Sequence, residues 1–128
     1  MKILLFGGAF DPPHNGHLSI LEEASRYTDF DKIIVMPTGT PTHKKGCTVP
    51  FDVRFYMAKL AFETVNKNVE ISDYEGTNLK DDYTYLTLRY LKEKYDNPQI
   101  FMLIGSDSLF SFKKWKNYGE VMVNCTPV

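Results

Sequence analysis

The sequence has few cysteines, no long apolar run and almost no net charge. Cys47 and Cys125 show no Cys-x-x-Cys spacing and no histidine placed to complete a zinc site, so we expect free thiols, with one disulfide as the alternative. The apolar run at 100–104 is far shorter than the roughly 20 residues of a membrane helix. Fifteen basic and sixteen acidic residues exclude a global field that attracts nucleic acid or anionic membrane. Because the first ten residues also lack the apolar region of a secretory signal, we expect a cytoplasmic protein.

The remaining composition suits one compact domain, since 128 residues with 43% hydrophobic and 14% aromatic content can form a core. Short apolar runs alternate with amphipathic helical patterns along the chain. Strands are expected at residues 2–6, 32–37, 69–72 and 99–105, and helices at 18–27, 51–65 and 84–95. This alternation predicts an α/β fold, a doubly wound Rossmann-like parallel sheet with helices on both faces. Ligands in such folds bind beyond the carboxyl ends of the strands.

The most informative stretch is GGAFDPPHNGH at residues 7–17, where the first strand should turn into a helix. Gly7 and Gly8 permit close backbone approach or unusual dihedral angles, and the free N–H groups of the helix start can receive an anion. His14 and His17 are three residues apart, which places them on one face of the first helical turn. We interpret the stretch as a phosphate-binding turn. The alternatives are a capped helix start with one buried imidazole, and a zinc site that lacks a third nearby ligand.

GGAFDPPHNGH resembles the Gly-x-Phe-Asp-Pro-x-His-x-Gly-His motif of the nucleotidylyltransferase superfamily, and its form here is similar to that of bacterial nicotinate-nucleotide adenylyltransferases. The similarity continues along nearly the whole chain at Pro41, His43, Lys44, Arg54, Met57, Tyr83, Thr84, Gly105, Asp107 and Trp115. The Ser/Thr-rich segment ending in arginine that binds the triphosphate in that family has no counterpart after Trp115. The resemblance implies a single nucleotidylyltransferase domain over residues 1–128 that lacks the usual C-terminal part.

The resemblance also implies an activity, the transfer of the adenylyl group of ATP to nicotinate mononucleotide. The products would be nicotinate adenine dinucleotide and pyrophosphate, in NAD biosynthesis, with Mg²⁺ carried by ATP and no metal held by the protein. The alternatives are an adenylyltransferase or cytidylyltransferase for another phosphorylated acceptor, and a truncated inactive nucleotide-binding domain. The sequence leaves open homo-oligomerisation, the activity of the 128-residue form and the choice between nicotinate and nicotinamide mononucleotide.

The implied reaction needs no strong general base, because a phosphate monoester is already mostly dianionic at neutral pH. Positioning and charge stabilisation suffice, and the implied catalytic residues are His14, His17 and Lys44. The implied nucleotide-binding residues are Gly7, Gly8, Phe10, Asp11, His43, Tyr83, Thr84, Gly105, Asp107 and Trp115. By the family's pattern, Asp107 would bind ribose, Tyr83 and Thr84 would hold the pyridine carboxylate region, and Trp115 would stack on the pyridine ring.

Several of these residues also have a purely structural interpretation. His43 and Lys44 could be solvated loop residues, Thr84 and Asp107 helix caps, and Trp115 a core residue. Arg54 could contact phosphate, pair with Asp52 or Glu63, or extend over apolar surface. Asp82 stands where the family usually has serine, which leaves the acid-versus-amide preference open.

Overall fold

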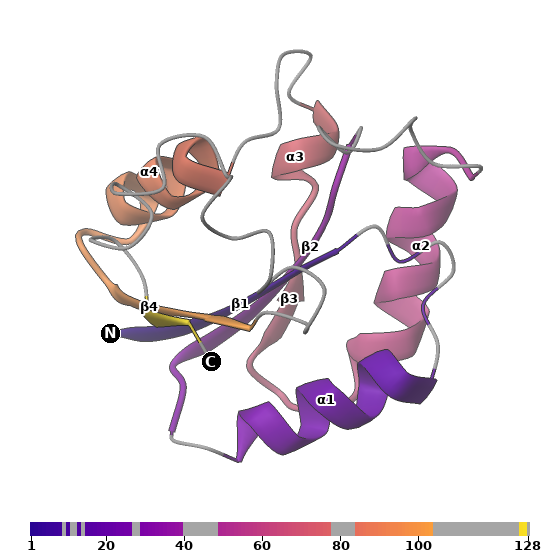
Figure 1. Cartoon of the computed structure of the whole chain (residues 1–128), viewed down its shortest axis with the longest axis horizontal. Coiled ribbons are helices and arrows are strands. Elements are labelled where there is room, and N and C mark those ends of the chain that lie inside the picture. Colours follow the sequence, from indigo (N-terminus) through magenta and orange to yellow (C-terminus); the bar gives the residue numbers. More distant parts are fainter. Residues whose placement is uncertain are drawn as a thin grey trace.

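The described strands form one parallel sheet, drawn in Figure 1. The computed structural model describes residues 1–8, 10, 13, 15–26, 29–39, 49–77, 84–103 and 126–127. Its elements in chain order are β1 (Lys2–Gly8), α1 (Asn15–Ser25), β2 (Lys32–Pro37), α2 (Phe51–Phe62), β3 (Val69–Ile71), α3 (Tyr74–Thr77), α4 (Thr84–Lys94), β4 (Gln99–Leu103) and β5 (Thr126–Pro127). The five described strands pair in the order β3-β2-β1-β4-β5, and every pairing is parallel. The predicted α/β fold is confirmed.

The first strand of the chain is the central strand of the sheet. β1 pairs with β2 from Ile3↔Lys32 to Gly8↔Pro37, and with β4 from Lys2↔Gln99 to Phe6↔Leu103. The chain therefore winds outward to β2 and β3 on one side of β1, and then to β4 and β5 on the other. In open α/β sheets, ligands bind at the carboxyl ends of the strands, at the point where the direction of winding along the sheet reverses. For this chain that position is the end of β1.

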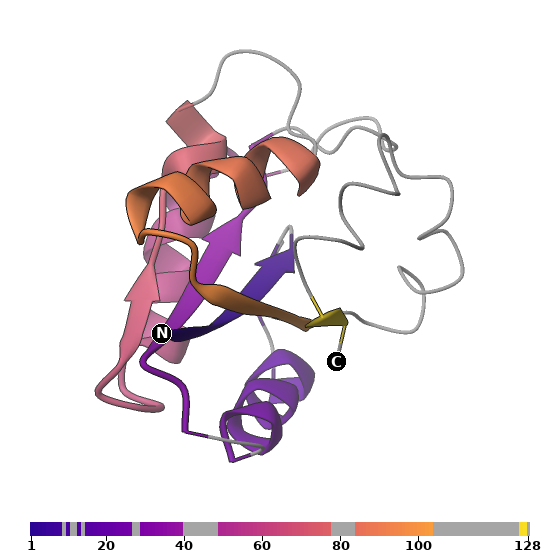
Figure 2. The same cartoon turned by 90° about the vertical axis from the view of Figure 1, so that its left-hand side faces the viewer.

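Alternate residues of β1 point to opposite faces of the sheet, and helices cover both faces. Ile3 and Leu5 pack with α4, whereas Leu4 and Phe6 pack with α1 and α2. Figure 2 shows α4 on one side of the strands and α1 on the other. The first face buries Ile3, Leu5, Ile34, Met36, Leu88, Leu91, Ile100 and Met102. The second buries Leu4, Phe6, Phe10, Leu21, Ala24, Phe30, Ile33, Val35, Ala58, Phe62 and Phe101.

Some boundaries differ from the sequence-based expectation. β1 continues through Gly8, because Gly7 and Gly8 pair with Met36 and Pro37 at the end of β2, so these glycines belong to the strand and not to a bend after it. α2 ends at Phe62, three residues earlier than expected. The short helix α3 and the edge strand β5 were not predicted, since four and two residues are too few to carry a periodic pattern.

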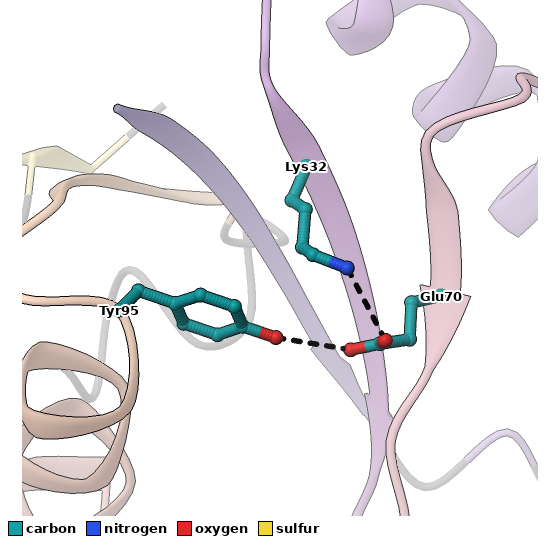
Figure 3. Close-up of polar contacts among 3 residues, drawn as sticks. All are labelled: Lys32, Glu70 and Tyr95. Carbon is teal, nitrogen blue, oxygen red and sulfur yellow. Dashed lines mark hydrogen bonds and ion pairs between the residues drawn. The ribbon is translucent and has the colours of Figure 1, made fainter.

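Glu70 ties the edge of the sheet to α4 at the end where the strands begin (Figure 3). Lys32 Nζ lies 3.3 Å from Glu70 Oε1, and the Tyr95 hydroxyl donates a hydrogen bond to Glu70 Oε2 at 3.2 Å. A hydrogen bond with Tyr90, together with nearby Tyr95 and Glu70, raises the pKa of Lys94. Because Lys32 is the first residue of β2, these contacts are remote from the carboxyl end of the strands.

None of the described helices is both long and apolar enough to cross a bilayer.

Candidate functional site

The candidate site lies where β1 and β2 end and α1 begins. Thr38 N–H donates a hydrogen bond to the Gly8 carbonyl at 2.9 Å, which extends the pairing of the two strands by one residue. α1 starts at Asn15, so His17 lies in its first turn. The first N–H groups of a helix have no partner within the helix and carry a partial positive charge. This end of the sheet therefore brings the start of a helix and an imidazole close to the carboxyl end of the central strand.

Phe10 supports the His17 ring from the interior. The Phe10 side chain is 2% exposed, and its ring meets the half-buried His17 ring at a centroid distance of 5.1 Å and an angle of 83°. The same Phe10 ring contacts Phe6 at 5.2 Å and Phe62 at 5.3 Å, both edge to face. The Phe10 side chain therefore belongs to the core, and it forms the wall against which His17 rests.

The strained backbone of this turn falls on Phe10 and not on the glycines before it. Phe10 has a φ of 49°, in the left-handed region that non-glycine residues rarely adopt. Gly8 is needed for a different reason, because a Cβ at this position would lie 3.3 Å from the Phe10 ring. At Gly7 the nearest atom would be the Met36 carbonyl oxygen at 3.8 Å, an ordinary contact. The close neighbour of Gly8 is thus the Phe10 ring, and unusual dihedral angles at the two glycines are not found.

Arg54 joins the end of β2 to the start of α2. Its side chain is 2% exposed, and its guanidinium donates hydrogen bonds to the carbonyls of Thr38 at 2.6 Å, Gly39 at 2.8 Å and Val49 at 2.9 Å. The Phe51 ring lies beside it, with its centroid 5.5 Å from Arg54 Cζ. Hydrogen bonds from a guanidinium to carbonyls are charge-assisted and among the stronger ones in proteins.

The burial of Arg54 could have been predicted from the sequence by helical spacing. Arg54, Ala58 and Phe62 are four residues apart, so they share one helical face, and all three are buried. An arginine on the core-facing side of a helix predicts a buried guanidinium with specific acceptors. Close to the Arg54 guanidinium, Thr38 Oγ1 is buried and has no hydrogen-bond partner among the described residues. The end of β2 is therefore followed by a buried hydroxyl that makes no hydrogen bond within the described part of the chain.

A second group of contacts links α3 to the helices on either side of it. Thr87 donates a hydrogen bond to Glu75 Oε2 at 2.6 Å, and the Tyr74 and Tyr90 rings stack at 3.9 Å and 11°. On the other side of α3, a Cβ at Gly76 would overlap the Phe51 ring. α3 is therefore packed closely against α4 and against the start of α2.

The structure brings together part of the set of residues that the sequence pointed to. Gly7, Gly8, Phe10 and His17 lie at one end of the sheet, and Thr84 is the first residue of α4. Outside the described residues lie Asp11, His14, His43, Lys44, Tyr83, Gly105, Asp107 and Trp115. Within the described ranges, no three His, Cys, Asp or Glu side chains are grouped so that they could hold a metal ion.

Comparison with known proteins gives relatives over almost the whole chain. The chain is 41% identical over 122 residues to the "Probable nicotinate-nucleotide adenylyltransferase" of Clostridium tetani, and the match covers 94% of this chain and 60% of that protein. The crystal structure of a "Putative Nicotinate-nucleotide Adenylyltransferase" from Vibrio parahaemolyticus superposes with a TM-score of 0.82 at 29% identity, covering 99% of this chain and 75% of that one. The fold is shared with the nicotinic acid mononucleotide adenylyltransferase of Plasmodium falciparum, complexed with NaAD, with a TM-score of 0.78 at 21% identity. The match covers 94% of this chain and 59% of that chain.

The chain spans about three fifths of the length of the curated relatives that it matches. The cytidylyltransferase-like family is matched over residues 5–128, which include all the described elements except the first three residues of β1. The chain therefore belongs to the cytidylyltransferase-like family.

Proposed function

We propose that the protein transfers the adenylyl group of ATP to nicotinate mononucleotide and releases pyrophosphate. The observation that carries the proposal is the placement of His17 in the first turn of α1, held edge to face by Phe10 at the carboxyl end of the central strand. The identity to relatives named as nicotinate-nucleotide adenylyltransferases supports the choice of acceptor. We also propose a cytoplasmic location, because the reaction consumes ATP.

In the proposed reaction, a phosphate oxygen of nicotinate mononucleotide attacks the α-phosphorus of ATP. A new P–O bond forms, the bond between the α-phosphorus and the oxygen bridging to the β-phosphate breaks, and its electron pair leaves with pyrophosphate. The nucleophile is anionic at neutral pH, so no proton has to be removed from it. The protein then has two tasks, to hold the two substrates in line and to stabilise the negative charge that develops on the bridging oxygen.

His17 and the start of α1 suit the second task. An imidazole that donates a hydrogen bond to a phosphate oxygen, next to the N–H groups of a helix start, stabilises developing negative charge. Packing against Phe10 limits the orientations of the His17 ring, so less reorganisation is required when the charge develops. We propose His14 as the second imidazole donor and Lys44 as a charge partner of the phosphates.

The remaining residues implied by the sequence are proposed to bind the two nucleotides. Gly7, Gly8, Asp11 and His43 would lie along the phosphates, Gly105 and Asp107 at the ribose, and Tyr83, Thr84 and Trp115 at the pyridine ring. For Phe10 we propose support of His17, because its side chain is in the core. Mg²⁺ carried by ATP would neutralise phosphate charge when bound, and an ion that arrives on a substrate does not require its own set of protein ligands.

The test is a substrate panel on the intact protein, with pyrophosphate release as the signal and mass spectrometry of the product. ATP with nicotinate mononucleotide should give nicotinate adenine dinucleotide. The panel also contains nicotinamide mononucleotide, pantetheine phosphate and, with CTP, phosphorylated sugar-alcohol acceptors. Faster transfer to another acceptor would replace the proposed substrate, and the absence of pyrophosphate release with every pair would refute the proposed activity.

A further inference from the structure

Two side chains on the buried face of α2, Arg54 and Phe62, are linked to the β1–α1 connection in different ways, Phe62 by direct contact and Arg54 through Thr38 after β2. Phe62 touches the Phe10 ring at 5.3 Å, and Phe10 is the residue that supports His17. Two turns earlier on the same face, Arg54 donates a hydrogen bond to the carbonyl of Thr38 at 2.6 Å. The Thr38 N–H in turn donates a hydrogen bond to the Gly8 carbonyl. A series of contacts therefore leads from Arg54 through Thr38 to Gly8, the residue next to the Phe10 ring.

The hydrogen bonds in this series are short, and the Arg54 side chain has little freedom. Arg54 is 2% exposed, and its planar guanidinium is held by three carbonyls in different directions, those of Thr38, Gly39 and Val49. Gly8 lies so close to the Phe10 ring that even a methyl group on Gly8 would be 3.3 Å from it. A shift of Thr38 would therefore also shift Gly8, which lies next to the Phe10 ring, and that ring is in contact with His17.

We propose that Arg54 is a positioning residue that sets the place of the His17 imidazole through Thr38, Gly8 and Phe10. The inference rests on the proposed function, in which His17 donates to a phosphate of the reacting nucleotides. The role assigned to Arg54 requires no direct contact with the substrate or with His17. Its contribution is to hold the ends of β1 and β2 at one spacing, and a displacement of about 1 Å at a reacting group can lower the rate on the order of 10²-fold.

An arginine suits this task better than a lysine. The guanidinium presents its donors in a rigid planar fork, whereas the lysine ammonium is a single charge on a flexible stem. Arg54→Lys keeps the positive charge but cannot reproduce the three hydrogen bonds in their directions. The substitution therefore separates the geometric role of Arg54 from its charge.

The first experiment observes His17 directly. The imidazole resonances of His17 are assigned in the intact protein by proton–carbon NMR, with the spectrum of His17→Ala as the reference. Arg54→Lys should shift these resonances, whereas the matched variant Arg26→Lys, at an exposed position after α1, should leave them unchanged. Unshifted His17 resonances in a folded Arg54→Lys protein would overturn the inference. This readout does not require turnover, so it remains decisive if the proposed reaction is refuted.

The second experiment is a double-mutant cycle for adenylyl transfer from ATP to nicotinate mononucleotide. Arg54→Lys should lower kcat about 10-fold or more with little change in KM. In the His17→Ala background the same substitution should have almost no further effect, because the group that it positions is gone. Equal losses in both backgrounds would show a general structural role and contradict the inference. If Arg54→Lys does not fold, Phe51→Leu, which removes the ring beside the guanidinium, takes its place in both experiments with the same expected pattern.

Discussion

The Phe10 and His17 rings meet edge to face, with centroids 5.1 Å apart and planes at 83°. To reach this place, Phe10 adopts a left-handed φ of 49°, which costs a non-glycine residue about 1–2 kcal/mol. The contacts of its ring with Phe6 and Phe62 offset that cost. Backbone strain held by surrounding packing is common at functional sites. The left-handed backbone at Phe10 is therefore held by its own aromatic side chain in the core.

Replacing Phe10 should lower the rate of adenylyl transfer by more than the accompanying loss of stability explains. Phe10→Leu removes the ring that supports His17, and we expect kcat to fall about 10-fold or more. The matched variant is Phe30→Leu, which shortens a buried phenylalanine of the same cluster that contacts Phe101 at 5.6 Å. Both changes should lower the free energy of unfolding by about 1–3 kcal/mol. Thermal unfolding and steady-state kinetics on the two variants decide the point, and equal kcat in both would contradict the support of His17 by Phe10.

The two glycines of β1 should respond differently to an added methyl group. In Gly8→Ala the new Cβ would meet the Phe10 ring at 3.3 Å, so the ring must move, whereas Gly7→Ala meets only an ordinary 3.8 Å contact. We expect Gly8→Ala to lower the melting temperature and to shift the His17 NMR resonances. Gly7→Ala should keep the parent melting temperature within a few degrees. The prediction fails if the two variants have the same melting temperature and the same His17 resonances.

The fold could be predicted because the signals for it are local. The apolar runs of β1 and β2 and the helical periodicity of α4 each lie within one short stretch, and the helix expected from residue 84 begins there. Their alternation then leaves few topologies, since parallel crossovers are right-handed. The same local pattern placed His17 in the first turn of α1.

The supporting residues of the site could not be predicted in the same way. The φ of Phe10 and the close approach of its ring to Gly8 depend on where Phe62 lies, and that is decided by the packing of α2 on the sheet. Arg54 shares a helical face with Ala58 and Phe62, but its carbonyl acceptors at Thr38, Gly39 and Val49 are set by the course of the chain between two elements. Sequence patterns identify which residue types are present, whereas these contacts depend on tertiary structure.

Glu70 should matter for stability and not for transfer, because its contacts lie at the opposite end of the sheet from His17. Glu70→Gln removes the ion pair with Lys32 and weakens the acceptor of the Tyr95 hydroxyl. Both charged side chains are partly exposed, so we expect a loss of only about 0.2–1 kcal/mol in the free energy of unfolding. Urea unfolding at low and high salt measures it, and the difference from the parent should shrink at high salt. A fall in kcat for Glu70→Gln would show that this end of the sheet influences the site.

Trp115 offers a direct signal for the acceptor, because it is the sole tryptophan of the sequence. If it stacks on the pyridine ring, nicotinate mononucleotide should quench its fluorescence in a saturable manner. Trp115→Phe keeps an aromatic face and shows that the signal comes from Trp115, and free tryptophan titrated in parallel is the control for inner-filter effects. An emission spectrum that stays unchanged at saturating nicotinate mononucleotide would return Trp115 to a structural role.

The two histidines of the motif should contribute to the rate far more than to binding. In His17→Ala and His14→Ala a hydrogen-bond donor to the developing negative charge is lost, which should lower kcat on the order of 10²-fold or more. The KM values for ATP and nicotinate mononucleotide should change little, because the adenine and pyridine ends keep their contacts. His17→Gln retains an N–H donor and the ability to pack against Phe10, so it should recover part of the loss. Turnover equal to the parent in His17→Ala would remove His17 from the chemistry, and with it the reason for the support that Phe10 gives to this ring.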